Sequence, residues 1–291
     1  MQVVFHLGAH CTDDGLLVNT LLKNRARLAE AGVIVAYPAR YRPILRDTVQ
    51  ALGGAVPGPE LQQNLLDAMV DEDAIGRLVL SNEHFLGTAP RAVGAGCLYP
   101  MAQARAAAYC ALFPGAACEF HLAIRNPAAF LPAVFGRLRD VKYSTFIAGT
   151  DPLGLRWSDT VERLRAGAPR AAITVWCDEE TPLIWPEVLR SVAGVGPEVP
   201  LVGESGRLAQ VMSRPGLERL EAYLGARPPA EPPVRQRITA AFLDKFARDE
   251  ALEEELELPG WTHAFVEELT ATYEADLQRI ARIDGVTVLG S

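Results

Sequence analysis

The segment VVFHLGAHCTDDG, residues 3–15, carries the pattern that indicates the fold. Residues 3–7 form a short run of mostly apolar side chains, which predicts a buried strand. Residues 8–15 are mostly polar and include two glycines, which indicates a turn. Leucines at helical spacing follow, and they predict a helix that ends near Gly32. The chain therefore opens with a strand, a loop and a helix.

The same alternation continues along the first two thirds of the chain. Apolar segments predict further strands at 33–37, 78–80, 119–124 and 172–176. Helical patterns lie at 101–113, 130–138, 157–164 and 184–192, and residues 39–72 are interpreted as an inserted Arg-rich loop with short helices. Strands that alternate with helices predict an α/β fold, in which helices cover both faces of a parallel sheet.

Beyond Gly203 the strand signals fade and helical patterns dominate. A proline-rich break at 227–233 separates them, and an acidic run at 249–257 is interpreted as a solvated helix face. We expect helices at 235–248 and 263–283, with a candidate last strand at 286–289. The length of 291 residues allows one large α/β domain with an extension. We predict an α/β domain at 1–200 and a helical extension at 201–291, packed on the same domain.

The charge balance limits the classes of partner. The chain has 36 acidic and 28 basic residues, a net charge of −8. This balance argues against a nucleic-acid partner or a broad anionic membrane surface, since both need concentrated positive charge. No apolar stretch approaches the roughly 20 residues that span a bilayer. The start lacks a signal-peptide pattern, and the five cysteines lack a tight pairing pattern, so we expect reduced thiols and a cytoplasmic protein.

Polar segments follow three of the predicted strands, at residues 8–15, 81–84 and 125–127. In a doubly wound sheet, ligands bind beyond the carboxyl ends of the strands. A turn that opens a helix also offers free backbone N–H groups and a positive dipole end. These three segments are therefore the candidate site.

The three segments also carry a resemblance to a known family. The stretch His6-Leu7-Gly8-Ala9-His10-Cys11-Thr12-Asp13-Asp14-Gly15, with Gly32-Val33 and Tyr37-Pro38 further on, resembles the opening of bacterial sulfotransferase-like proteins. Ser81-Asn82-Glu83 and Arg125-Asn126-Pro127 are similar to two later motifs of that family. The family belongs to the P-loop superfamily. The resemblance implies a three-layer P-loop-type fold, and transfer of a sulfuryl group from 3′-phosphoadenosine 5′-phosphosulfate to a hydroxyl or amine of a small molecule or glycan.

The resemblance also implies roles for individual residues. Glu83 is similar to the general base that takes the acceptor proton, with His10 and His84 as alternative bases. Arg125 matches the arginine that grips the 3′-phosphate of the donor. The loop that would bind the donor comprises Gly8, His10, Cys11, Thr12, Asp13, Asp14 and Gly15.

The chain departs from the family at the donor loop. Cys11 stands in the place of the loop lysine, Asp13-Asp14-Gly15 replaces Gly-Thr-Thr, and Ala133 replaces a serine that contacts the 3′-phosphate. A preorganised charge of the lysine's kind typically contributes factors of about 10² to 10³ in rate. An aspartate about 4 Å from the donor would repel it by about 4 kcal/mol at an effective dielectric of 20.

These departures open alternatives. An arginine such as Arg40 or Arg42 would have to fold over the loop to replace the lysine. Without a replacement, the protein would be a non-catalytic binding or scaffold protein, and a transferase with another nucleotide donor ranks third.

Each candidate residue also has a structural interpretation. Asp13 and Asp14 suit the start of a helix as caps, although they would also suit a bound cation. Glu83 and Arg125 would serve equally as partners in local hydrogen bonds and ion pairs. His6, His10 and Cys11 are potential metal ligands, but the close cysteine pairs of a zinc site are missing, so we predict no metal.

Overall fold

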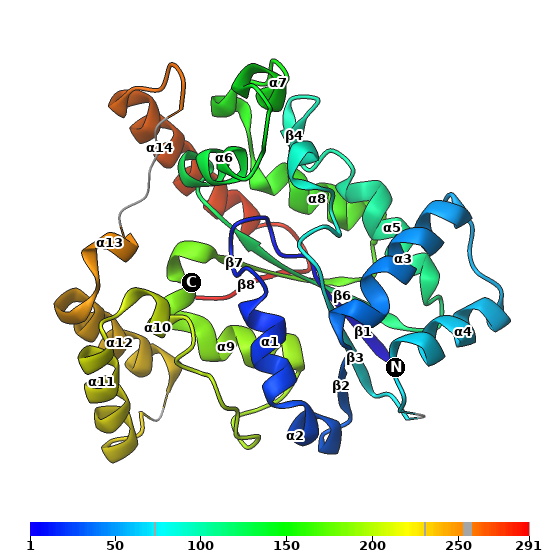
Figure 1. The fold of residues 1–291 in the computed structure, drawn as a ribbon, viewed down its shortest axis with the longest axis horizontal. Helices are drawn as coiled ribbons and strands as arrows, with labels where there is room; N and C mark the ends of the chain where they lie inside the picture. The colour runs from blue at the N-terminus through cyan, green and yellow to red at the C-terminus, as the bar shows by residue number, and fades with distance from the viewer. Residues whose placement is uncertain (73, 230, 253–257, 291) are drawn as a thin grey trace.

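The computed structural model describes residues 1–72, 74–229, 231–252 and 258–290. Its centre is a six-stranded sheet in the order β2-β3-β1-β6-β7-β8, in which every neighbouring pair is parallel (Figure 1). The predicted α/β fold class, with its parallel sheet and helical C-terminal region, is confirmed. The strands are β1 Gln2–His6, β2 Val33–Val35, β3 Arg77–Ser81, β6 Ala117–Ile124, β7 Ala172–Cys177 and β8 Val286–Val288, with a separate hairpin of β4 Val93–Gly94 and β5 Cys97–Leu98.

Alternating side chains of the strands build two apolar layers. Val3 and Phe5 of β1 face one layer, and Val4 faces the other, and all three are fully buried. The second layer is closed by α1 Leu16–Lys23, α2 Arg25–Glu30 and α9 Thr181–Ala193. The first layer is closed by α3 Pro38–Leu52, α4 Pro59–Met69, α5 Ala102–Leu112, α6 Pro127–Gly136, α7 Tyr143–Ile147, α8 Trp157–Gly167 and α14 His263–Ile280. Figure 1 shows α1 and α9 on one side of the sheet and α5, α8 and α14 on the other. Burial of each large apolar side chain contributes about 1.5–3 kcal/mol.

Two helix predictions were wrong in detail. The first helix is interrupted at Asn24, whose side-chain amide donates to the carbonyls of Thr20 and Val202 and whose Oδ1 accepts from the Val202 amide. Residues 39–72, where an Arg-rich loop with short helices was expected, form two longer helices of 15 and 11 residues, α3 and α4. Only Tyr41 and Leu45 are fully buried in the first of them, so its apolar face is narrow.

The C-terminal region adds further helices and returns to the sheet. After α10 Leu208–Val211, α11 Arg214–Ala226 and α12 Pro232–Phe246 pack on each other around a small apolar cluster of their own, and α12 also contacts α9. The acidic run begins in α13 Asp249–Leu252, and its residues 253–257 lie outside the described residues. The candidate last strand is confirmed, because β8 pairs with β7. The division near residue 200 stays a prediction. No helix in the described part of the chain has the length and apolar character needed to cross a membrane.

Candidate functional site

The strand order places the three candidate segments at one end of the sheet. β1 lies between β3 and β6, so the segments that follow these strands emerge side by side. The chain leaves β1 toward β2 at one edge, whereas it leaves β6 toward β7 on the opposite side. Adjacent strands whose connections diverge in this way leave a crevice, which is the usual ligand position in open α/β sheets. Residues 8–15 and Arg125 border this crevice.

The loop after β1 is held in an unusual backbone conformation. Gly8 and Gly15 have φ values of 46° and 81°, and the non-glycine residues Cys11 and Asp14 have φ values of 62° and 50°. A left-handed conformation costs an ordinary residue roughly 1–2 kcal/mol, so the surroundings must hold it. Arg125 contributes, because its Nη1 donates to the Cys11 carbonyl at 2.6 Å.

Two further hydrogen bonds fix the same loop. The Thr12 hydroxyl donates to the Ala9 carbonyl at 2.7 Å, inside the loop. The backbone N–H of His10 donates to the Tyr99 hydroxyl at 3.0 Å, which ties the loop to the chain just after β5. The loop is therefore a fixed part of the structure, and its His10 amide is already occupied.

The two aspartates of the loop have different contacts. Asp13 Oδ2 accepts a hydrogen bond from the Leu17 amide at 2.8 Å, as expected for a carboxylate at the start of the helix, although the N-cap residue itself is Gly15. Asp14 is more exposed and pairs with the guanidinium of Arg137. The Asp13 carboxylate therefore occupies a backbone N–H group at the helix start, where an anionic ligand would otherwise bind.

Arg137 is a cation at the loop that no sequence motif indicated. It follows directly after α6, and its Nη2 pairs with Asp14 while its Nη1 lies 3.5 Å from Glu83 Oε2. It thereby links the β1 loop to the segment after β3. No local motif marks Arg137, because only the length and direction of α6 bring it back over the loop.

Arg40 and Arg42, the two arginines considered as replacements for the lysine, have different contacts. Arg42 lies beside it and donates twice to the Ser81 carbonyl, at 3.1 and 2.9 Å. Arg40 pairs instead with Asp71 at 2.6 Å and bonds carbonyls at the end of α4. Of the two expected arginines, Arg42 is therefore the one that reaches the site.

A cavity of about 380 Å³ lies beside the loop, and we call it the loop cavity. Its walls include three carboxylates and two guanidinium groups, and the lining residues are Asp13, Asp14, Gly15, Arg42, Ser81, Glu83 and Arg137. The formal charge of this lining is −1. The loop cavity is therefore not an electropositive anion site in the form that the structure shows.

A chain of hydrogen bonds joins Tyr99, His10 and His84. The Tyr99 hydroxyl lies 2.7 Å from His10 Nδ1, and His10 Nε2 lies 3.1 Å from His84 Nδ1. Tyr99 is fully buried and its oxygen already accepts from the His10 amide, so its O–H proton is best satisfied by donating to Nδ1. His10 then carries its proton on Nε2 and donates to His84.

Burial keeps His10 in its neutral form. Its side chain is almost fully buried, and this lowers the pKa of His10 to about 4, with the nearby His84 and Arg137 acting in the same direction. His10 does not reach solvent. Of the two expected alternative bases, it therefore suits a positioning role, and His84 is the one that is open to a ligand.

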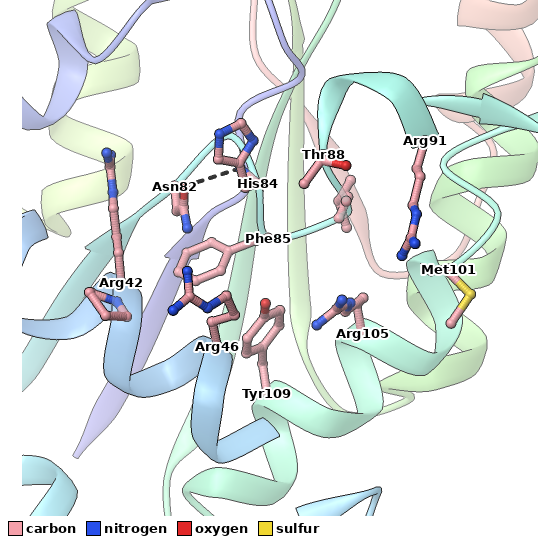
Figure 2. Close-up of a pocket in the computed structure, with 13 residues that line it drawn as sticks. Arg42, Arg46, Asn82, His84, Phe85, Thr88, Arg91, Met101, Arg105 and Tyr109 are labelled. Atoms are coloured by element: carbon pink, nitrogen blue, oxygen red, sulfur yellow. Dashed lines mark hydrogen bonds between the residues drawn. The ribbon is translucent and has the colours of Figure 1, made fainter. Parts of the chain in front are cut away.

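The segment after β3 separates two cavities. Ser81 and Glu83 line the loop cavity, whereas Asn82 and His84 line a second cavity of about 290 Å³ (Figure 2). The nearest approach between Glu83 Oε1 and His84 Nε2 is 4.0 Å. Two potential bases thus face two neighbouring cavities from one short segment.

Three further positions of the predicted donor site, Cys11, Asn126 and Ala133, have surroundings that the structure describes. Cys11 is buried, and burial raises its pKa to about 11, so the thiol is neutral at pH 7 and supplies no charge. Asn126 Oδ1 accepts from the Ala128 amide and caps α6. Ala133 is partly buried in α6 against the main apolar layer, where its methyl group offers no hydrogen bond.

A buried carboxylate at the end of β7 was not among the candidates. Asp178 pairs with Arg207 at 3.0 Å and lies close enough to Arg125 and Asp13 to interact with both. Burial raises the pKa of Asp178 to about 6, and Arg207 opposes that shift without cancelling it. Its position after a strand was the available signal.

His6 is a core residue with one partner. It is buried, its Nδ1 lies 2.8 Å from the Ser81 hydroxyl, and its ring stacks on Trp176. Among the residues that the structure describes, no group of three or more His, Cys, Asp or Glu side chains is placed to hold a metal ion.

No protein-family model matches the chain, and a search of curated proteins finds no significant match.

Proposed function

We propose that this protein is a sulfotransferase-like enzyme, which transfers a sulfuryl group from 3′-phosphoadenosine 5′-phosphosulfate to a hydroxyl or amine acceptor. The observation that supports this most is the convergence of the three motif segments on one loop. Arg125 donates to the loop carbonyl of Cys11, and Arg137 links Asp14 of the loop to Glu83. The segments 8–15, 81–84 and 125–127 are at least 41 positions apart in sequence, and each resembles one motif of the family.

Glu83 is the proposed general base. The acceptor oxygen or nitrogen would form a bond to the sulfur while the bond between sulfur and the phosphate-bridging oxygen breaks. The acceptor proton would pass to the Glu83 carboxylate, and adenosine 3′,5′-bisphosphate would leave with the electron pair of the broken bond. His84, which is half exposed, is the alternative proton acceptor.

Arg137 is our proposed replacement for the missing lysine. In the free protein its charge is shared between Asp14 and Glu83, and its side chain is 40% exposed. Ion pairs at this exposure typically contribute only about 0–1 kcal/mol, so a donor anion could displace them at small cost. Displacement would also release Glu83 for proton transfer.

A non-catalytic binding or scaffold protein is the second candidate. It is favoured by the charge of the loop cavity, where three carboxylates face two guanidinium groups, and by the Asp13 carboxylate on the Leu17 amide. Both features oppose an anionic donor. Under this proposal the fold is retained and the donor does not bind.

Calorimetric titration with adenosine 3′,5′-bisphosphate separates the two candidates. We expect micromolar binding to the natural protein, about tenfold tighter binding to Asp14→Asn, and loss of binding in Arg137→Ala. Arg214→Ala, which removes a highly exposed arginine on α11, is the matched control and should bind like the natural protein. Absence of binding to both the natural protein and Asp14→Asn would refute the transferase proposal.

A second set of variants tests the loop directly. The triple variant Cys11→Lys, Asp13→Gly, Asp14→Thr restores the family-like loop. If donor binding occurs only in the triple variant, the natural protein is the non-catalytic candidate. If the natural protein binds the donor, Glu83→Gln should abolish donor-dependent labelling of an acceptor while binding remains.

We also propose a cytoplasmic location. All five cysteines, each in a described part of the chain, are free thiols. Reduced thiols are typical of proteins that function in a reducing compartment.

A further inference from the structure

The second cavity is bordered by four arginines. Arg42 and Arg46 come from α3, Arg91 lies just before the β4–β5 hairpin, and Arg105 lies on α5. Figure 2 shows their side chains arranged around the hollow. All of the lining residues fall in the described part of the chain, and none of them is Asp or Glu. We call this cavity the arginine pocket.

The charge of the arginine pocket is largely uncompensated. Arg46 pairs with Asp47 at 2.8 Å, but both side chains are well exposed, where water screens such a pair. Arg42 bonds the neutral Ser81 carbonyl and also faces the carboxylates of the loop cavity, whereas Arg105 lies near the neutral Tyr109 hydroxyl. Three further guanidinium groups around one hollow, those of Arg46, Arg91 and Arg105, are unexpected in a chain whose net charge is −8. An anionic occupant would relieve their mutual repulsion.

The arginine pocket also has a rigid aromatic floor. Phe85 and Tyr109 are buried, and their rings meet edge to face with centroids 4.8 Å apart. Phe5 of β1 packs against both rings, which fixes the floor to the central sheet. Because both rings are almost fully buried, they support the base of the pocket rather than offer a face to a ligand. The arginines above them suit tetrahedral anions through forked hydrogen bonds.

The volume limits the size of the occupant. At about 290 Å³ the arginine pocket lies at the lower end of the range for small-molecule sites, which is roughly 300–1,000 Å³. A single sugar with its substituents is of this size, whereas an oligosaccharide would extend beyond it.

We propose that the arginine pocket binds a monosaccharide that carries two tetrahedral anionic groups, either phosphate or sulfate. The anionic groups contact Arg46, Arg91 and Arg105, and the sugar ring fills the space between these three side chains. His84 lines the same pocket, so a hydroxyl of the bound sugar lies near a potential base. The binding proposal stands on the pocket alone. The further statement that this sugar is the acceptor rests on the proposed transfer reaction.

Calorimetric titration of the full chain tests the binding proposal. The probes are fructose 1,6-bisphosphate, glucosamine 2,6-disulfate, inorganic pyrophosphate and unsubstituted fructose. We expect micromolar binding of at least one anionic sugar, at least tenfold weaker binding of pyrophosphate, and no binding of fructose. The anionic sugar that binds more tightly identifies the phosphate or sulfate class. Raising NaCl from 50 to 500 mM should weaken binding at least tenfold.

Variants locate the binding within the arginine pocket. Arg91→Gln with Arg105→Gln should weaken binding of the anionic sugar at least 30-fold, whereas Arg214→Ala on α11 should change it less than twofold. Thermal unfolding of each variant verifies that it is folded. The proposal is overturned if neither anionic sugar binds, if pyrophosphate binds as tightly, or if the double variant binds like the natural protein.

The same experiment distinguishes this proposal from the proposed reaction. Arg137→Ala should leave binding of the anionic sugar intact, since Arg137 lines the loop cavity and not the arginine pocket. Sugar binding without any donor binding would support the pocket and refute the transfer. Donor binding without sugar binding would refute the proposed sugar site and leave the proposed transfer reaction standing.

Discussion

Replacement of His10 by glutamine should change how stability depends on pH. His10 is buried, bonded to Tyr99 and His84, and its pKa is lowered from 6.5 to about 4. In the unfolded chain His10 binds a proton as the pH falls below about 6.5, but in the folded protein it does so only below about 4. The unfolded state therefore gains protons over this window, and the folded state loses stability as the pH falls.

The expected size follows from the width of that window. A pKa difference of about 2.5, at about 1.36 kcal/mol per unit, corresponds to about 3 kcal/mol between neutral pH and pH 4. By pH 5 about 2 kcal/mol of this is already lost. Typical domains have a total stability of only about 5–15 kcal/mol, so urea unfolding detects such a change easily.

The assay compares the natural protein with His10→Gln at pH 7, 6 and 5. Other groups titrate over the same range, and Asp178 acts in the opposite direction because burial raises its pKa to about 6. The difference between the two proteins at each pH removes these shared contributions. We expect the stability of the natural protein relative to His10→Gln to fall by about 2 kcal/mol from pH 7 to pH 5.

His263→Gln is the matched control, since it makes the same chemical change at an exposed helix position. Because the His263 side chain is exposed, its replacement controls for the loss of one titratable imidazole from the chain. Parallel curves for His10→Gln, within about 0.5 kcal/mol, would show that His10 is not held neutral in the folded protein and would refute the reasoning.

Three further substitutions test the packing around the site by urea unfolding at pH 7. Asp276→Ala should cost about 3 kcal/mol or more, because the buried carboxylate accepts from two amides and a hydroxyl at the start of α8, and their loss leaves buried donors unpaired. Gly167→Ala should destabilise by about 2 kcal/mol or more, since its Cβ would lie 2.1 Å from a backbone oxygen of α5, whereas Gly115→Ala has open space and should stay within about 1 kcal/mol. Tyr99→Phe should cost about 1–3 kcal/mol, because it leaves the His10 amide and Nδ1 without their partner; unchanged stability would contradict that hydrogen bond.

The sheet could be predicted because its strands are buried on both faces. β1, β3 and β6 present nearly continuous apolar runs between turn signals, and such runs are visible in the sequence. The break at Asn24 could not be predicted, because its partner Val202 lies 178 residues away. Local patterns contain no information about a contact of that kind.

The candidate site likewise contains residues that the sequence could indicate and residues that it could not. The segments 8–15, 81–84 and Arg125 follow strands, so the order of a parallel sheet brings them together and sequence can indicate them. Arg137 and Tyr99 reach the loop from the end of a helix and from a short hairpin. Their positions depend on how those elements pack, which local spacing does not determine.

The charges that the two cavities share predict that ligands bound in them weaken each other's binding. Arg42 lines both the loop cavity and the arginine pocket, and the wall between them is a single segment. A polyanion bound in the arginine pocket therefore lies well within the Debye length of about 8 Å from Arg42 and would lower the positive potential that an anionic donor meets. We expect adenosine 3′,5′-bisphosphate to bind more weakly, by about threefold or more, when the arginine pocket holds an anionic sugar. Linkage requires the sugar to be weakened by the same factor. Independent binding of the two ligands in paired titrations would mean that the cavities do not share Arg42 as an electrostatic contact.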